Sequence, residues 1–100
     1  MSNKKSYVGF HLYFSKTNEK KMQYFETNLF NFTQFQDMLK IMNCENVKKY
    51  YVYRSSEIGG KKSKIGNFTK QEEKEMIQHI CSIIHTSSIT PTLYFHIHNN

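Results

Sequence analysis

Three of the five histidines are spaced so that β-strands would bring their imidazoles to one surface. His96 and His98 are alternate residues, and His11 lies in another alternating stretch far away in the sequence. Alternate residues of a strand point to the same side, so His11 joins the other two if these stretches pair. Three imidazoles on a rigid backbone can bind zinc. No cysteine or carboxylate neighbours them in sequence, so we expect a polar, pH-sensitive surface and no metal site.

The sequence contains no pattern typical of an activated nucleophile or a phosphate-binding loop. There is no Gly-x-Ser-x-Gly, and no GxxxxGK[ST] motif. The stretch Gly59-Gly60-Lys61-Lys62-Ser63 lacks the upstream glycine and is not followed directly by a helix, so a basic hairpin tip explains it better. We expect no enzyme, no catalytic residue and no cofactor.

The thiols and the clustered acids have structural explanations. Cys81 falls in the apolar stripe of an expected helix, where a free thiol behaves as a small buried hydrophobe. Cys44 lies near a helix end and could be exposed, but no base is placed beside it. Glu72, Glu73 and Glu75 lie where a helix begins, and the helix dipole favours negative charge there. We therefore expect none of them to act as paired catalytic carboxylates.

Length and charge favour one basic, intracellular domain. The chain has 100 residues and a net charge of +6, which suits a single domain over residues 1–100 with a flexible stretch at 1–6. Such a charge favours anionic partners. The sequence has two cysteines, no apolar stretch after its basic start and no run that could span a membrane. We expect a cytoplasmic or nuclear protein with free thiols and no membrane partner.

Hydrophobic periodicity predicts seven elements in the order ββαββαβ. Strict alternation favours strands at 7–14 and 93–98, and the segments 20–27, 47–54 and, more weakly, 61–68 are further strands. A helix is expected to begin after an N-cap at Asn31 or at Thr33, with an apolar stripe of Phe35, Met38, Leu39 and Met42. A second helix is expected after the Thr69–Glu72 capping box, with a stripe of Ile77, Ile80, Cys81 and Ile84.

These elements predict an α+β two-layer sandwich: a mixed five-stranded sheet with two helices on one face. Each helix has one apolar stripe and can cover one surface, and both should cover the side that bears Val8, Phe10, Leu12, Phe95 and Ile97. A ferredoxin-like or RRM-like βαββαβ plan with an extra hairpin strand is the alternative.

This order resembles the ubiquitin-like β-grasp family, in particular the PB1-type interaction domain. Lys20 and Lys21, followed by Met-Gln-Tyr-Phe, stand where that family carries a basic pair, and Phe68 to Ile77 is similar to the segment entering its second helix. The resemblance implies that the first and last strands are central neighbours and that the basic pair binds an acidic loop of another copy. The expected acidic loop is replaced by Ser55-Ser-Glu-Ile-Gly-Gly-Lys-Lys, and a lysine within the first strand is missing, so this chain would carry only the basic face.

Two surfaces are candidate binding sites. The first is an aromatic sheet face, which is expected to hold Tyr7, His11, Tyr13, Tyr94, His96 and His98. The second is basic and comprises Lys20, Lys21, Lys48, Lys49, Arg54, Lys61, Lys62 and Lys64. Exposed aromatics in this number are typical of a contact surface, although loops of the same chain could also cover the face.

We expect a non-catalytic protein-interaction module that binds an acidic partner, or itself, through these surfaces. The alternative is a small RNA- or single-stranded-DNA-binding protein that uses the same face, because stacking aromatics beside lysines suit single strands. The sequence lacks an RNP-type motif, and Lys64-Ile-Gly-Asn-Phe is only faintly similar to one.

Overall fold

The computed structural model describes residues 10–44, 46–55, 60–85 and 92–99. It confirms the predicted α+β fold and element order. The elements are β1 (Phe10–Lys16), β2 (Gln23–Thr27), α1 (Phe32–Ile41), β3 (Val47–Ser55), β4 (Ser63–Thr69), the 3₁₀ turn η1 (Lys70–Glu72), α2 (Glu73–His85) and β5 (Thr92–Asn99).

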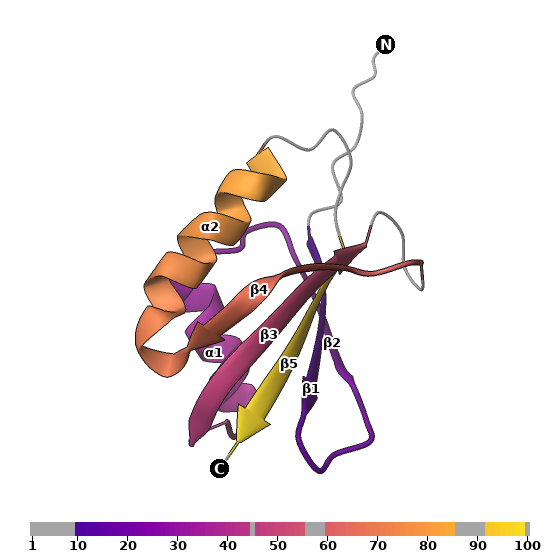
Figure 1. Ribbon diagram of the computed structural model, residues 1–100, viewed down its shortest axis with the longest axis vertical. Helices are drawn as coiled ribbons and strands as arrows, with labels where there is room; N and C mark the ends of the chain where they lie inside the picture. The colour runs from indigo at the N-terminus through magenta and orange to yellow at the C-terminus, as the bar shows by residue number, and fades with distance from the viewer. Residues whose placement is uncertain (1–9, 45, 56–59, 86–91, 100) are drawn as a thin grey trace.

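The five strands form one mixed sheet in the order β2-β1-β5-β3-β4, with β5 between β1 and β3 (Figure 1). The β1–β5 pair is parallel, and the other three pairs are antiparallel. The first and last strands are therefore neighbours at the centre of the sheet, and β2 and β4 form its two edges.

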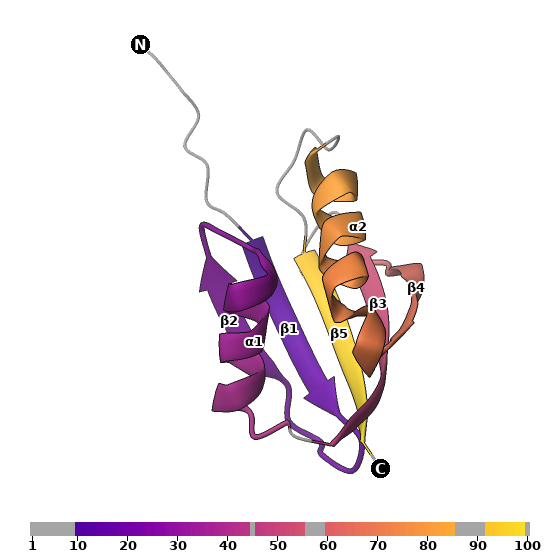
Figure 2. The ribbon, with the colours of Figure 1, turned by 90° about the vertical axis from the view of Figure 1, so that its left-hand side faces the viewer.

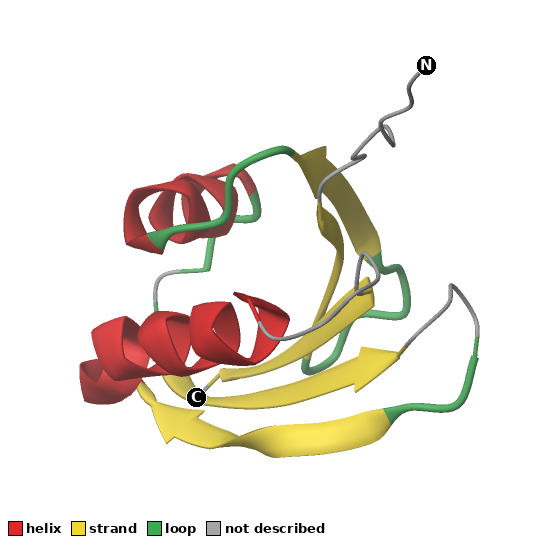
Figure 3. Cartoon of the chain, turned by 90° about the horizontal axis from the view of Figure 1, so that it is seen from above, coloured by secondary structure: helices red, strands yellow, loops and turns green. Residues whose placement is uncertain are grey.

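Both helices lie on the same side of the sheet, as the single apolar stripe of each one predicts (Figure 2). Seen from above, the sheet curves around the helix layer, and no helix of the described residues lies on its other face (Figure 3). Leu12, Phe14 and Phe95 are fully buried against the helices, and the Phe14 and Phe95 rings stack with centroids 4.8 Å apart. From α1, Phe35 packs on Phe95 at 5.4 Å.

Short polar signals set the helix boundaries. The Asn31 side chain accepts a hydrogen bond from the Gln34 amide at 2.9 Å and caps α1. The predicted capping box of Thr69 and Glu72 is present, and in it the Glu72 carboxylate accepts a hydrogen bond from the Thr69 amide at 2.8 Å. The first turn there is the 3₁₀ turn η1, and α2 begins at Glu73. Asn43 follows α1 with a φ of 57°, a left-handed conformation that asparagine tolerates and that reverses the chain.

Three boundaries differ from the prediction. The second strand begins at Gln23, so Lys20 and Lys21 lie in the exposed connection between β1 and β2. The weakly predicted strand at 61–68 is β4, which begins at Ser63, ends at Thr69 and pairs with β3. The first strand continues to Lys16, so a lysine does lie within it, contrary to expectation; its ammonium contacts the Met42 carbonyl at 2.9 Å and the Glu19 carboxylate at 3.2 Å.

Two side chains lie elsewhere than predicted. Cys44 is buried at 7% exposure, since the reversal at Asn43 turns the chain back under α1. Cys81 is only half-buried, because it lies at the margin of the α2 stripe, with its thiol 3.3 Å from the Phe30 carbonyl. Both cysteines are free thiols.

Several predictions fall outside the described residues. These are the flexible stretch at 1–6, the start of the first strand with Tyr7 and Val8, the glycine turn at Gly59, the stop at Pro91 and the side chain of Ile84. Within the described part of the chain, neither helix is long and apolar enough to cross a membrane.

Candidate interaction surface

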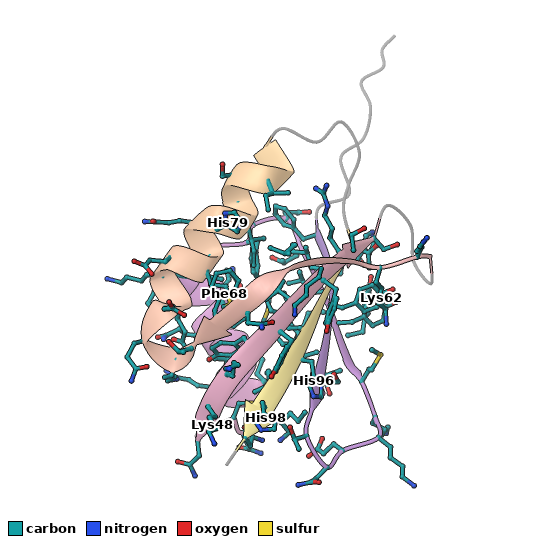
Figure 4. All side chains as sticks on the ribbon, in the orientation of Figure 1. Lys48, Lys62, Phe68, His79, His96 and His98 are labelled. Carbon is teal, nitrogen blue, oxygen red and sulfur yellow. The ribbon has the colours of Figure 1, made fainter. Side chains whose placement is uncertain are left out.

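The face of the sheet opposite the helices carries aromatic and basic side chains from all five strands. The register of the strands identifies the residues of this face, because residues paired across neighbouring strands point to the same side. We call this surface the aromatic–basic face; it comprises His11, Tyr13, Tyr24, Lys49, Tyr51, Tyr53, Lys62, Lys64, Tyr94, His96 and His98. In Figure 4, Lys62, His96 and His98 lie on the side of the molecule away from α2, whereas His79 and Phe68 lie where α2 meets β4.

Tyrosine rings stack across the middle of this face. Tyr13 and Tyr94 are register partners on β1 and β5, their ring centroids are 5.2 Å apart and their planes differ by 16°. Two coplanar rings lying flat on the sheet could not approach so closely, so these rings stand upright and face each other. Tyr24 on β2 continues the row, with its centroid 4.8 Å from that of Tyr13.

Two lysines, one from β4 and one from the connection before it, lie over tyrosine rings of this face. The Lys62 ammonium is 4.2 Å from the centroid of Tyr94, and that of Lys64 is 5.7 Å from the centroid of Tyr51. Because β1 and β3 flank β5 on opposite sides, the Tyr94 ring lies between Tyr13 and Lys62. Tyr94 was expected to be exposed, but only 7% of it is, because neighbouring side chains cover its ring. Tyr13, Tyr51 and Tyr53 are half-buried and Tyr24 is exposed, so the surface presents parts of these rings and ammonium groups to the solvent, and ring edges and ammonium groups both attract negative charge.

The three histidines predicted on this face do lie there, each half-buried and each bonded through Nδ1 to a hydroxyl group. His11 Nδ1 lies 2.6 Å from the Tyr24 hydroxyl and His96 Nδ1 lies 3.0 Å from Ser15 Oγ. His98 Nδ1 lies 3.2 Å from Thr17 Oγ1. These contacts fix the ring orientations and leave each Nε2 to other partners.

The predicted pairing of the first and last strands does not gather the histidines into one cluster. His11 pairs with Thr92, four residues before His96 on β5, which is a separation of about 13 Å. Among the described residues, no group of three histidine, cysteine, aspartate or glutamate side chains could hold a metal ion.

The structure divides the predicted basic set. Lys49, Lys62 and Lys64 belong to the aromatic–basic face, and Lys61 is exposed in the connection just before β4. Arg54 is exposed but pairs with the inward-pointing Leu93, so the pleat directs it to the other side of the sheet. Lys48 falls at a register irregularity between β3 and β5. Lys20 and Lys21 form a separate exposed pair beside β2.

Sequence reasoning missed three tyrosines of this face. Tyr51 and Tyr53 are register partners of His96 and Tyr94, and Tyr24 is the partner of Tyr13. The sequence shows that these tyrosines alternate with Tyr50, Val52 and Phe25. Residues 50–53 are all tyrosine or valine, however, so their types do not show which alternate set points away from the helices. Strand order and register supply that information.

A buried polar cluster on the helix side was also missed. Glu73 was attributed to helix-start charge, but it is 5% exposed and joins three elements. Its carboxylate accepts hydrogen bonds from the Tyr50 hydroxyl and from Gln36 Nε2, the latter at 3.1 Å, and it pairs with the Lys70 ammonium at 3.0 Å. Burial, and then the adjacent Glu73 carboxylate, raises the pKa of Tyr50 far above its ordinary value. No local signal distinguishes Glu73 from its acidic neighbours.

Two open hollows lie outside the aromatic–basic face. One of about 290 Å³ lies between the end of α1 and η1, and Cys44, Lys40 and Lys70 line it. The other, of about 280 Å³, lies between the β1–β2 connection and the end of α1, and Met22, Lys21 and Ile41 line it.

Comparison of the chain with protein-family models, with curated proteins and with solved structures finds no match.

Proposed function

We propose that this protein is a non-catalytic interaction module that binds an acidic segment of a partner protein on its aromatic–basic face. The observation that supports it best is the pair of lysines over tyrosine rings, Lys62 on Tyr94 and Lys64 on Tyr51. Within the described strands, Glu26 on β2 is the carboxylate that shares this face, and it stands at the edge beside His11. A partner with carboxylates meets ammonium groups and the positive edges of aromatic rings across the rest of the surface.

The arrangement favours a protein partner over a single-stranded nucleic acid. Base stacking requires a free ring face, and the Tyr94 ring has Tyr13 on one side and Lys62 on the other. Tyr13 is itself packed between Tyr94 and Tyr24. Ring edges, in contrast, suit carboxylates and backbone carbonyls. Nucleic-acid binding remains the second candidate, supported by the exposed ring of Tyr24, of which 41% is accessible.

The resemblance to PB1-type domains remains a hypothesis within this proposal. The central position of the β1–β5 pair agrees with it. Of the two surfaces through which PB1-type domains bind each other, this chain would carry the basic one, which binds an acidic loop. Lys16 supplies a lysine within the first strand, although Glu19 and the Met42 carbonyl occupy its ammonium group.

The test measures binding of two labelled probes, an oligoglutamate peptide and an oligothymidylate strand, by fluorescence anisotropy at low and moderate salt. We expect oligoglutamate to bind, and the double variant Lys62→Glu/Lys64→Glu to weaken it by at least about tenfold because two attractive charges become repulsive. The control is Lys40→Glu, an exposed charge reversal on α1 in the helix layer, which should leave binding nearly unchanged.

Two outcomes contradict the proposal. The first is an oligoglutamate probe that does not bind at low salt. The second is tighter binding of oligothymidylate that falls by about tenfold on Tyr13→Ala or Tyr24→Ala, since loss of base stacking has that effect; this result would favour the nucleic-acid alternative. Circular dichroism of each variant checks that the fold is retained.

A further inference from the structure

The two edges of the sheet differ in how well they are protected from pairing with another strand. An unprotected edge strand is a template for association, and bulges, lysines and covering elements are the usual protections. At the β4 edge, Val52 pairs with Gly66 and Tyr53 pairs with Lys64, so Ile65 is an extra residue that makes a bulge. Lys64 lies within this strand, and Phe68 contacts His79 of α2 with centroids 6.2 Å apart.

The β2 edge has none of these protections. Its register with β1 runs without a shift from Gln23 to Thr27, and it contains neither lysine nor proline. Its outer side has no strand partner within the described part of the chain. Of the four exposed large hydrophobic residues described, Tyr24 lies in this strand, and Met22 and Leu29 lie within two residues of its ends.

The sequence around this edge is complementary to itself. Tyr24 and Glu26 point to the aromatic–basic face with their partners Tyr13 and His11. Residues 20–22 precede β2 and are not paired with β1. An edge pairing that extends the strand back to Lys20 would continue this alternation and put Met22 and Lys20 on the same side, so that the order along the edge becomes Lys20, Met22, Tyr24, Glu26. An antiparallel copy reads the reverse order, which brings a lysine opposite a glutamate and a methionine opposite a tyrosine.

We propose that the β2 edges of two copies of this chain pair antiparallel about a two-fold axis at Gln23. Lys20 then faces Glu26 of the second copy, and Met22 faces Tyr24 of the second copy, each contact occurring twice. Cross-strand pairs of opposite charge and of apolar side chains stabilise a sheet, and like charges placed opposite each other destabilise it.

The two-fold axis stands perpendicular to the sheet, so the dimer has one continuous ten-stranded sheet with both aromatic–basic faces on the same side. The edge contact is short compared with a standard interface of about 1,600 Å². The dimer is therefore weak, with a dissociation constant of about 100 µM.

Sedimentation velocity between about 20 µM and about 1 mM tests this pairing, since that range spans the expected dissociation constant. The wild type should shift from monomer to dimer. Lys20→Glu alone and Glu26→Lys alone should each weaken association by at least about tenfold. An equimolar mixture of these two variants should dimerise, because the heterodimer has opposite charges at both positions, and a folding defect would not be rescued by mixing. Lys64→Glu at the opposite edge is the control and should not reduce dimerisation.

A wild-type protein that stays monomeric over the whole range overturns the proposal, and so does a mixture that associates no better than its two components. Both results are independent of the probe-binding experiment, since self-association through β2 does not require the aromatic–basic face to be occupied.

Discussion

The Tyr50 hydroxyl donates a hydrogen bond to the Glu73 carboxylate and so ties strand β3 to helix α2 inside the core. Tyr50 is fully buried, and Gln36 from α1 contacts the same carboxylate. A single carboxylate thus joins both helices to the sheet. The loss of a donor to a buried acceptor costs free energy, so this cluster should be sensitive to substitution.

Tyr50→Phe should lower the free energy of unfolding by about 1–3 kcal/mol, because it removes a buried hydrogen bond to a charged group and leaves Glu73 Oε2 with the Lys70 ammonium as its remaining partner. Urea denaturation followed by circular dichroism measures the change. Tyr53→Phe is the matched control: it removes the same hydroxyl from the open face of the same strand and should change stability by no more than about 0.5 kcal/mol. Equal effects of the two substitutions would contradict a special role for the Tyr50–Glu73 contact.

Stability should fall in alkaline solution, and Tyr50 should be responsible for part of the loss. Burial keeps the pKa of this hydroxyl raised in the folded protein, whereas a tyrosine in the unfolded chain ionises near about pH 10. Above that pH the unfolded state releases a proton that folded Tyr50 retains, so unfolding becomes more favourable by up to about 1.4 kcal/mol per pH unit. Denaturation curves of the wild type and Tyr50→Phe at pH 9 to 11 should converge as pH rises; parallel curves would count against the assignment.

The Tyr94 ring should contribute to stability as well as to binding. It packs on Tyr13 and carries Lys62 above it, so Tyr94→Leu should cost about 1–3 kcal/mol. Lys62→Ala should cost no more than about 1 kcal/mol, because the lysine stem and a single cation–π contact are all that is lost. Thermal and urea unfolding measure both values. If Tyr94→Leu is neutral, the stack does not hold β1 to β5 on this face.

Cys44 should react slowly with thiol reagents in the folded protein. Burial raises the pKa of its thiol, and the thiolate is the reactive form. In the variant Cys81→Ala, which leaves Cys44 alone, the reaction with a chromogenic disulfide should be at least about tenfold slower than for the same variant in urea. A folded-state rate equal to the unfolded rate would place the Cys44 thiol at the surface.

The fold was predictable because its periodic signals agree with one another. The alternation around Leu12 and Phe95 and the stripes of the two helices each indicate a single buried face, and one arrangement of layers satisfies all of them. The extent of β2 was not predictable, because Lys20 to Met22 continue the alternation without being paired to β1.

The candidate site was predictable where strands alternate strictly and not elsewhere. His11, Tyr13, Tyr94, His96 and His98 were assigned to one side correctly, because their inward neighbours are strongly apolar. The lysines over the tyrosines and the buried position of Glu73 depend on how distant segments meet. Such contacts have no signature within a short stretch of sequence.

The position of β5 has a consequence for how the polypeptide acquires its structure. Without Thr92–Asn99, the remaining strands form two separate hairpins, β1–β2 and β3–β4, which share no strand pairing, and an isolated hairpin is at best marginally stable in water. During synthesis, the two hairpins can join into one sheet only after β5 has been made, because β5 lies between them. A fragment cut before Thr92 and a peptide of residues 92–99 are thus a complementing pair, which would report on sheet closure when recombined.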